Sequence, residues 1–225
     1  MKLKVIILGS TGMVGKGVLL ECLESNLVES VLVINRKTCN MQHPKLKEII
    51  HSDFYNFDSL TSELSGFNAC FFCLGISSAG LSEQGYYKIT YDLTLHFAGS
   101  ILKASPEIIF CYVSGAGTDS SMKSKMMWAR VKGKTENDLL AMPFKGAYMF
   151  RPGFIQPMKG IRSRTGLYNF LYFFFKPFYF ILKSFRNFVT NTESMGKAMI
   201  YIARDGYAKN ILECSDINIL AESKE

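Results

Sequence analysis

The sequence predicts an α/β fold with a doubly wound parallel sheet, and two observations carry this prediction. Short apolar runs rich in β-branched residues alternate with helical patterns as far as Phe150, an alternation typical of βαβ units. A turn containing Gly9, Gly12 and Gly15 joins the first apolar run to the first helical pattern. A glycine turn between a buried strand and a helix is the usual phosphate-binding unit of such sheets.

The remaining elements follow from the same patterns. Strands are expected at Lys4–Leu8, Val31–Ile34, Lys47–Ile50, Asn68–Leu74, Glu107–Val113, Gly146–Phe150 and Asn210–Cys214, which are short apolar runs. Helices are expected at Met13–Ser25, Phe57–Leu64, Tyr87–Leu102, Met126–Met142 and Met195–Ala203, with apolar residues at helical spacing. With 225 residues, we expect a single domain over 1–225 with one core, in which 152–192 form an aromatic-rich substrate or lid region.

Positive charge is concentrated in the second half of the chain. The net charge is +7, and the stretch from Lys123 to Arg186 holds thirteen basic and two acidic residues. Such a field suits a phosphate-bearing cofactor, an anionic substrate, a membrane surface or nucleic acid. The sequence contains no recognised nucleic-acid reader motif, so we expect a small-molecule substrate and no nucleic-acid partner.

Cysteine and histidine usage indicates neither disulfides nor a metal site. The six cysteines are scattered and most fall in apolar patterns, where a reduced thiol packs as a small hydrophobe. The three histidines are isolated and do not have the spacing of metal ligands. The first strand follows Met1 almost directly, so the sequence predicts a reducing cytoplasmic location.

The segment from Leu167 to Phe188 is unusually aromatic. Lys176 and Pro177 interrupt it near its centre, and a membrane span needs about 20 consecutive apolar residues. A transmembrane helix is therefore rejected. A substrate-pocket lid, a dimer face and an interfacial helix on a membrane remain open, in that order of preference, and the protein is expected to be a monomer or homodimer.

The residues at the ends of the predicted strands favour NADP over NAD. The second strand ends in Asn35, Arg36 and Lys37, where NAD-binding units carry an acid that accepts from the ribose. A guanidinium at this position can bind a 2′-phosphate through two charge-assisted hydrogen bonds, although solvated surface basic residues are the alternative. NAD stays possible. The full set assigned to the cofactor is Gly9, Thr11, Gly12, Met13, Val14, Gly15, Arg36, Lys37, Asp53, Phe54, Leu74, Gly75, Lys132, Pro152 and Gly153.

Within this set, the residues after the third and fourth strands have specific roles. The Asp53 carboxylate can accept from the adenine amino group, and the Phe54 ring can lie against the base. Leu74 and Gly75 end the fourth strand, where glycine lets a cofactor pass without a side-chain clash.

Several motifs together resemble the atypical short-chain dehydrogenase/reductases. They are GSTGMVG, the Asn-Arg-Lys end of the second strand, FFCLG, VSGAG, WARVKG and Arg-Pro-Gly, and they span nearly the whole chain. The branch that they resemble most contains Tat-interacting-protein-like and NAD-dependent epimerase-like proteins. The resemblance implies a Rossmann domain with a small C-terminal substrate region, and an oxidoreductase or epimerase-like activity.

The resemblance also implies where the chemistry takes place. Active members use a serine after the fifth strand and a Tyr-x-x-x-Lys pair on the next helix, which i,i+4 spacing places on one face. The lysine binds the nicotinamide ribose and lowers the pKa of the tyrosine, which transfers a proton. Ser114 and Lys132 match the serine and the lysine, and Trp128 occupies the tyrosine position.

The tryptophan at this position leaves three interpretations open. An indole N–H donates a hydrogen bond but has no acceptor lone pair and cannot carry a proton near neutral pH. The chain is then an oxidoreductase or epimerase with another proton donor, for which Ser114, Tyr86, Tyr87 and Tyr148 are candidates. Alternatively, it is a catalytically silent NADP(H)-binding regulatory or redox-sensing protein. In the third interpretation, Trp128 is a core residue of a shifted helix.

Overall fold

The computed structural model describes residues 2–161 and 186–222. Within these residues, seven parallel strands form one sheet in the order β3-β2-β1-β4-β5-β6-β9. Their bounds are β1 Leu3–Leu8, β2 Val28–Asn35, β3 Leu46–Ile50, β4 Ala69–Phe72, β5 Ile109–Val113, β6 Gly146–Arg151 and β9 Ile211–Glu213. This order, with its reversal beside β1, is that of a Rossmann sheet. The predicted doubly wound parallel sheet is confirmed.

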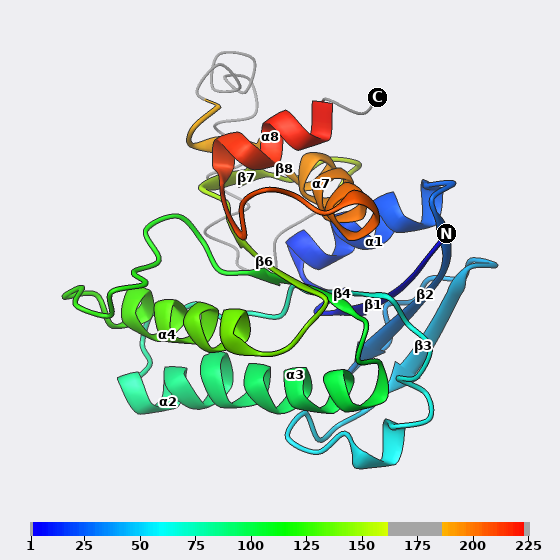
Figure 1. Ribbon diagram of the computed structural model, residues 1–225, viewed down its shortest axis with the longest axis horizontal. Helices are drawn as coiled ribbons and strands as arrows, with labels where there is room; N and C mark the ends of the chain where they lie inside the picture. The colour runs from blue at the N-terminus through cyan, green and yellow to red at the C-terminus, as the bar shows by residue number, and fades with distance from the viewer. Residues whose placement is uncertain (1, 162–185, 223–225) are drawn as a thin grey trace.

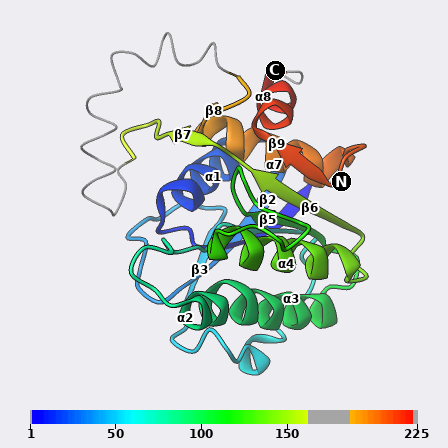
Figure 2. The ribbon, with the colours of Figure 1, turned by 90° about the vertical axis from the view of Figure 1, so that its left-hand side faces the viewer.

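Helices cover both faces of the sheet, as Figures 1 and 2 show. One face carries α1 (Met13–Glu24), α7 (Thr192–Asp205) and α8 (Cys214–Glu222). The other carries α2 (Glu83–Tyr87), a π-helical turn η2 (Lys88–Asp92), α3 (Leu93–Ala104) and α4 (Met127–Ala141). Because successive strand residues point to opposite faces, Val5 and Ile7 join the core under α1 and α7, whereas Ile6 and Leu8 join the core over α3.

A second, two-stranded parallel sheet lies between β6 and β9 in sequence. It pairs β7 (Phe154–Gln156) with β8 (Val189–Asn191), and Asn191 caps α7 by accepting from the Ser194 amide at 2.8 Å. The helix that follows packs closely on α1, since a Cβ added at Gly17 would lie 2.4 Å from the Thr192 Cβ. The prediction of a distinct region over 152–192 stays a prediction, because 162–185 lie outside the described residues.

Three local expectations differ from the structure. The helix expected at Phe57–Leu64 is wrong: only the 3-10 turn η1 (Asp58–Leu60) forms there, because the segment is short and its N-cap Phe57 offers no capping side chain. The second strand begins at Val28, three residues earlier than expected. The expected strand at Asn210–Cys214 is Ile211–Glu213, and Cys214 opens α8, which the sequence patterns did not indicate.

The aromatic segment contributes little to the described structure. Residues 167–185, on which the lid, dimer-face and interfacial-helix interpretations depend, lie outside the described residues. Its last residue, Phe188, has a side chain that is 69% exposed. In the part of the chain that the structure describes, none of the helices combines the length and hydropathy needed to cross a membrane.

Candidate functional site

The turn between β1 and α1 has the close geometry that the glycines predict. Gly9 has φ +84°, and a Cβ there would lie 2.7 Å from the Leu74 nitrogen. The Gly12 amide donates to the Gly9 carbonyl at 2.9 Å, and a Cβ at Gly15 would lie 2.2 Å from that carbonyl oxygen. Gly9 and Gly15 therefore require glycine. Gly12 is also the N-cap of α1 and has no side chain to accept from the first-turn amides, so these N–H groups suit a phosphate.

The other residues assigned to this turn lie around it. Thr11, Met13 and Val14 are half-buried, and Met13 and Val14 form the first turn of α1. Val14 also packs against the core under α1. Their contact with a cofactor stays a prediction.

The end of β2 is tied to the glycine turn by a hydrogen-bond network that the sequence did not reveal. Ser10 Oγ donates to Asn35 Oδ1 at 2.9 Å, and Asn35 Nδ2 donates to Glu48 Oε1 at 2.7 Å. Glu48 also accepts from Thr38 Oγ1 at 2.7 Å and from the Cys39 amide at 2.9 Å. Partial burial acts to raise the pKa of Glu48, but these hydrogen bonds outweigh it and the pKa lies below its ordinary value. The carboxylate thus fixes the loop after β2.

Arg36 and Phe54, which are far apart in sequence, come together at this edge of the sheet. The guanidinium carbon of Arg36 lies 5.9 Å from the centroid of the Phe54 ring, within the range of a cation–π contact. Arg36 and Lys37 are exposed, and Phe54 is buried. The Asp53 carboxylate accepts from the Tyr55 amide at 2.9 Å. Asp53 therefore caps its own turn. The contact with adenine predicted for it stays a prediction.

A cavity lies between the glycine turn and the loop after β2. Its volume is about 150 Å³. It is lined by Ser10, Thr11, Lys16, Leu19, Thr38, Cys39 and Met41. The sequence reasoning missed Lys16, although a basic residue directly after the last glycine of the turn was the signal available. The glycine turn and the loop after β2, which form the two halves of the predicted adenosine site, thus border one cavity, and Lys16 is among its lining residues.

At the end of β4, Leu74 is half-buried and Gly75 is exposed. A Cβ at Gly75 would meet no described atom within 4 Å. Contacts among the described residues therefore do not require glycine here, and the predicted passage of a cofactor over Gly75 stays a prediction.

The structure brings Ser114 and Lys132 together, as the sequence predicts. Lys132 Nζ donates a hydrogen bond to the Ser114 carbonyl. Burial lowers the pKa of Lys132 to about 8, and the negative charge of Glu136 opposes this shift. A lysine with this pKa is partly neutral at slightly alkaline pH.

Trp128 lies one helical turn before Lys132 and packs on the loop after β5. A Cβ added at Gly117 would lie 3.3 Å from Cη2 of the indole. Trp128 is half-buried and belongs to neither hydrophobic core cluster. In the described structure Trp128 therefore packs on this loop outside the two core clusters, and the interpretation of Trp128 as a core residue of a shifted helix is not supported.

A buried ion pair that the sequence reasoning missed lies behind these residues. Glu136 is 0% exposed and pairs with Arg151, whose Nε lies 3.1 and 3.2 Å from its two oxygens. Ser114 Oγ donates to Glu136 Oε1 at 2.5 Å. Arg151 also donates to Ser120 Oγ at 2.6 Å. The available signal was helical spacing, since residues 128, 132 and 136 share one face of α4.

Pro152 and Gly153 connect this site to the second sheet. The Ala116 amide donates to the Pro152 carbonyl at 2.8 Å. A Cβ at Gly153 would lie 2.3 Å from the Phe188 carbonyl oxygen, so glycine allows the close approach of the two chains. Both residues border the loop that carries Ser114, and their predicted contact with a cofactor stays untested.

The three candidate tyrosines are not placed beside Lys132 by any described contact. The Tyr148 hydroxyl accepts from the Tyr207 amide at 3.2 Å. Residue 207 precedes β9, at the amino edge of the sheet, so Tyr148 is removed from the candidate proton donors. Tyr86 is 2% exposed, and burial raises the pKa of its hydroxyl. The Tyr87 ring lies 4.5 Å from that of Tyr91.

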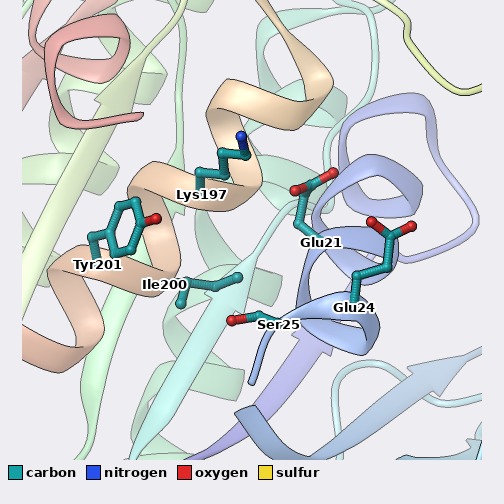
Figure 3. Close-up of a pocket in the computed structure, with 6 residues that line it drawn as sticks. All are labelled: Glu21, Glu24, Ser25, Lys197, Ile200 and Tyr201. Carbon is teal, nitrogen blue, oxygen red and sulfur yellow. The ribbon is translucent and has the colours of Figure 1, made fainter. Parts of the chain in front are cut away.

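A larger cavity of about 230 Å³ lies outside this site. It is lined by Glu21, Glu24, Ser25, Lys197, Ile200 and Tyr201 (Figure 3). Figure 3 shows Glu21, Glu24 and Ser25 at the end of α1, and the other three residues on α7. Glu21 and Glu24 belong to the last turn of α1, the end opposite the glycine turn. Both pair with Lys159 Nζ at 2.6 Å, so the acidic wall of this cavity is already neutralised in part.

Comparisons with known proteins give relatives over about two thirds of the chain. No family profile matches the chain. Protein fmp52, mitochondrial, of Emericella nidulans is 29% identical over 157 residues, covering 67% of this chain and 66% of the relative. Protein HTATIP2 of Rattus norvegicus is 29% identical over 151 residues, covering 66% of this chain and 61% of the relative. The match thus spans less than two thirds of these relatives.

The names of these relatives correct one expectation. The fmp52 and FMP52 proteins of three fungi are named mitochondrial. The cytoplasmic location expected from the sequence is therefore wrong by this comparison. That expectation depended on the absence of a signal peptide, which does not distinguish between compartments inside the cell.

Solved structures show the same fold at low sequence identity. The ADP-L-glycero-D-manno-heptose-6-epimerase of Helicobacter pylori has a TM-score of 0.66 at 14% identity, covering 98% of this chain and 82% of that chain. The Bordetella bronchiseptica enzyme WbmG, solved in complex with NAD, has a TM-score of 0.66 at 10% identity, covering 99% and 78%. The chain is therefore similar in sequence to the FMP52 and HTATIP2 proteins over about two thirds of its length, and its fold is the Rossmann fold of the solved short-chain dehydrogenase and epimerase structures.

Proposed function

We propose that this chain binds NADP(H) and acts as an oxidoreductase or epimerase-like protein on a small substrate. One observation carries the cofactor part of the proposal. The loop after β2, which presents Arg36 and Lys37, is held by Glu48 and faces the glycine turn across a cavity walled by Lys16. A loop fixed before binding loses little conformational entropy when a phosphate is bound.

The residues of this edge suit a dinucleotide with a 2′-phosphate. The glycine turn and the first-turn amides of α1 would hold the pyrophosphate, and Arg36 would bind the 2′-phosphate through charge-assisted hydrogen bonds. Lys132 would bind the nicotinamide ribose. When bound, the dinucleotide supplies the hydride chemistry, while Trp128 can donate its indole N–H to a substrate oxygen.

A second function is favoured by the same catalytic positions. Trp128 has no proton to transfer near neutral pH, and the Ser114 hydroxyl donates to Glu136. A catalytically silent protein that binds NADP(H) and signals its state to a partner accounts for both features.

The cofactor proposal is tested with the fluorescence of Trp128, the one tryptophan of the chain. Titration with NADPH and NADH is expected to quench it, with NADPH binding more tightly. Arg36→Ala should weaken NADPH at least about tenfold, the loss expected for a hydrogen bond between charged groups, and leave NADH nearly unchanged. Lys103→Ala, an exposed lysine in the last turn of α3, is the matched control. Equal losses for both cofactors, or no binding of either at millimolar concentration, contradicts the proposal.

Turnover separates the two functions. NADPH oxidation is measured with a panel of carbonyl compounds for the parent and for Trp128→Tyr. Activity of the parent supports an oxidoreductase, whereas activity of the variant alone supports the silent binding protein.

A further inference from the structure

Four polar side chains form one buried cluster behind the candidate site. Glu136 on α4 is fully buried, and the side chain of its partner Arg151 on β6 is only 12% exposed. Ser114, in the loop after β5, donates its hydroxyl to Glu136, and Lys132 on α4 donates to the Ser114 carbonyl. Removing charged groups from water is costly unless each is paired, so a buried cluster of this kind must be held together by its own contacts.

The Ser114 hydroxyl has a single hydrogen, and its neighbours determine whether it can donate that hydrogen to a substrate. Arg151 donates to both oxygens of Glu136, and a carboxylate paired in this way only accepts hydrogen bonds. Ser114 Oγ lies 2.5 Å from Glu136 Oε1 and 3.1 Å from the Phe150 carbonyl oxygen. Both neighbours are acceptors and a hydroxyl has one hydrogen. Ser114 therefore has no hydrogen left to donate to a substrate.

Lys132 is joined to the same carboxylate in two ways. Lys132 and Glu136 are one turn apart on α4, where i,i+4 side chains are neighbours. Both residues also bind Ser114: Lys132 Nζ donates to its backbone carbonyl, and Glu136 accepts from its hydroxyl. A change at Glu136 must therefore affect Lys132 both through its charge and through the position of Ser114.

We propose that Glu136 is a positioning residue of the candidate site, which keeps Lys132 protonated and fixes Ser114 as a hydrogen-bond acceptor. The role of Glu136 in cofactor binding rests on the NADP(H) site proposed above. Its effect on Lys132 is expected in the protein without cofactor as well. Arg151 connects the same carboxylate to the turn at Pro152 that borders the loop of Ser114.

The charges around Lys132 define the direction of the expected effect. Among the described residues, Glu136 on its own helix is the charged group that acts on Lys132. Glu136 pairs in turn with Arg151 on β6, and Glu213 on β9 lies 3.3 Å beyond Arg151. Burial lowers the pKa of Lys132, and Glu136 is the neighbour that raises it. Removing the negative charge of Glu136 should lower this pKa further.

The test measures the Lys132 pKa in the protein without cofactor. Lysines are labelled by reductive 13C-methylation and titrated by NMR, with the Lys132 signal assigned by its absence in Lys132→Arg. Glu136→Gln should lower this pKa by at least about one unit, the size of effect expected from a charge one helical turn away. Asp138→Asn is the matched control on the same helix, since Asp138 pairs with Lys134 at 2.9 Å on the part-exposed side. An unchanged Lys132 pKa in Glu136→Gln overturns the proposal.

Two further measurements keep the result unambiguous. Should Glu136→Gln fail to fold, the double variant with Arg151→Met removes the ion pair as a unit and should still lower the Lys132 pKa. An unchanged value there overturns the proposal equally. NADPH affinity, followed by Trp128 fluorescence, should fall several-fold in Glu136→Gln and not in Asp138→Asn. Failure of the parent to bind NADPH would contradict the proposed function and leave the NMR result standing.

Discussion

Two Gly→Ala substitutions in neighbouring helices should change stability in opposite directions. Gly133 lies in α4 directly after Lys132, and a Cβ there would lie 1.8 Å from the Asp119 carbonyl oxygen and 2.5 Å from its carbonyl carbon. A Cβ at Gly99 in α3 would meet nothing within 4 Å. Sequence propensity alone predicts that both changes stabilise their helices, by about 0.5–1 kcal/mol.

The clash at Gly133 cannot be relieved by rotating a side chain. The opposing atoms are backbone, and the Asp119 carboxylate holds the same loop by accepting from the amides of Lys123 and Ser124 at 2.8 and 2.6 Å. The helix and the loop must separate by roughly an ångström. Overpacking of this kind costs about 1–3 kcal/mol of stability. Because the loop at Asp119 is held by its own hydrogen bonds, we expect a cost near the upper limit of that range. When the gain in helix propensity is subtracted from this cost, Gly133→Ala should lower the free energy of unfolding by about 2 kcal/mol.

The assay is equilibrium unfolding in urea, followed by circular dichroism and by Trp128 fluorescence, with thermal unfolding alongside. Gly99→Ala should raise the free energy of unfolding by about 0.5–1 kcal/mol and the midpoint temperature by about 1–4 °C. Gly133→Ala should lower both, and should weaken NADPH binding because Lys132 and Trp128 move with the helix. If Gly133→Ala is as stable as Gly99→Ala, the close approach of α4 to this loop is refuted.

Two other predictions concern Lys132 and the glycines of the cofactor site. Because burial lowers the pKa of Lys132 to about 8 in the folded protein, the unfolded chain binds more protons between pH 8 and 10.5. The stability of the parent relative to Lys132→Met should therefore rise by up to about 3 kcal/mol over that range, and a flat difference in urea midpoints would contradict this. Gly15→Ala should lower both stability and NADPH affinity because of its 2.2 Å contact. Gly75→Ala should leave the midpoint temperature unchanged and lower NADPH affinity alone, and equal behaviour of the two variants would argue against the predicted path of the cofactor.

The parts of the site that could be predicted are those with a local signature. The strand, the glycine turn and the helix that follows are contiguous in sequence, so their order is sufficient to predict how Gly9, Gly12 and Gly15 come together. Lys132 could be placed beside Ser114 only through the resemblance to the short-chain dehydrogenase/reductases, whose motif puts a lysine on the helix after the strand that ends in the serine. Arg36 and Phe54 could be assigned to one edge because the carboxyl ends of neighbouring parallel strands lie side by side.

The residues that were missed depend on partners that sequence patterns do not pair. Glu48 and Glu136 look like ordinary surface acids on a strand and a helix, and only the folded chain shows their buried partners Asn35 and Arg151. Tyr148 was a reasonable proton donor by composition, but its position in β6 directs the hydroxyl to the amino edge. Helix α8 lacks a separate signal because the last strand runs directly into it at Cys214.

Local apolar spacing and a glycine turn were thus enough to predict the α/β class and the first βαβ unit, which the structure has, and the edge proposed for the cofactor. These depend on backbone conformation and on the burial of adjacent residues. The buried ion pair, the loop held by Glu48 and the role left to Ser114 depend on polar groups that must find partners when water is removed. Their partners lie on different strands and helices, and only the packing of the whole sheet decides which groups meet.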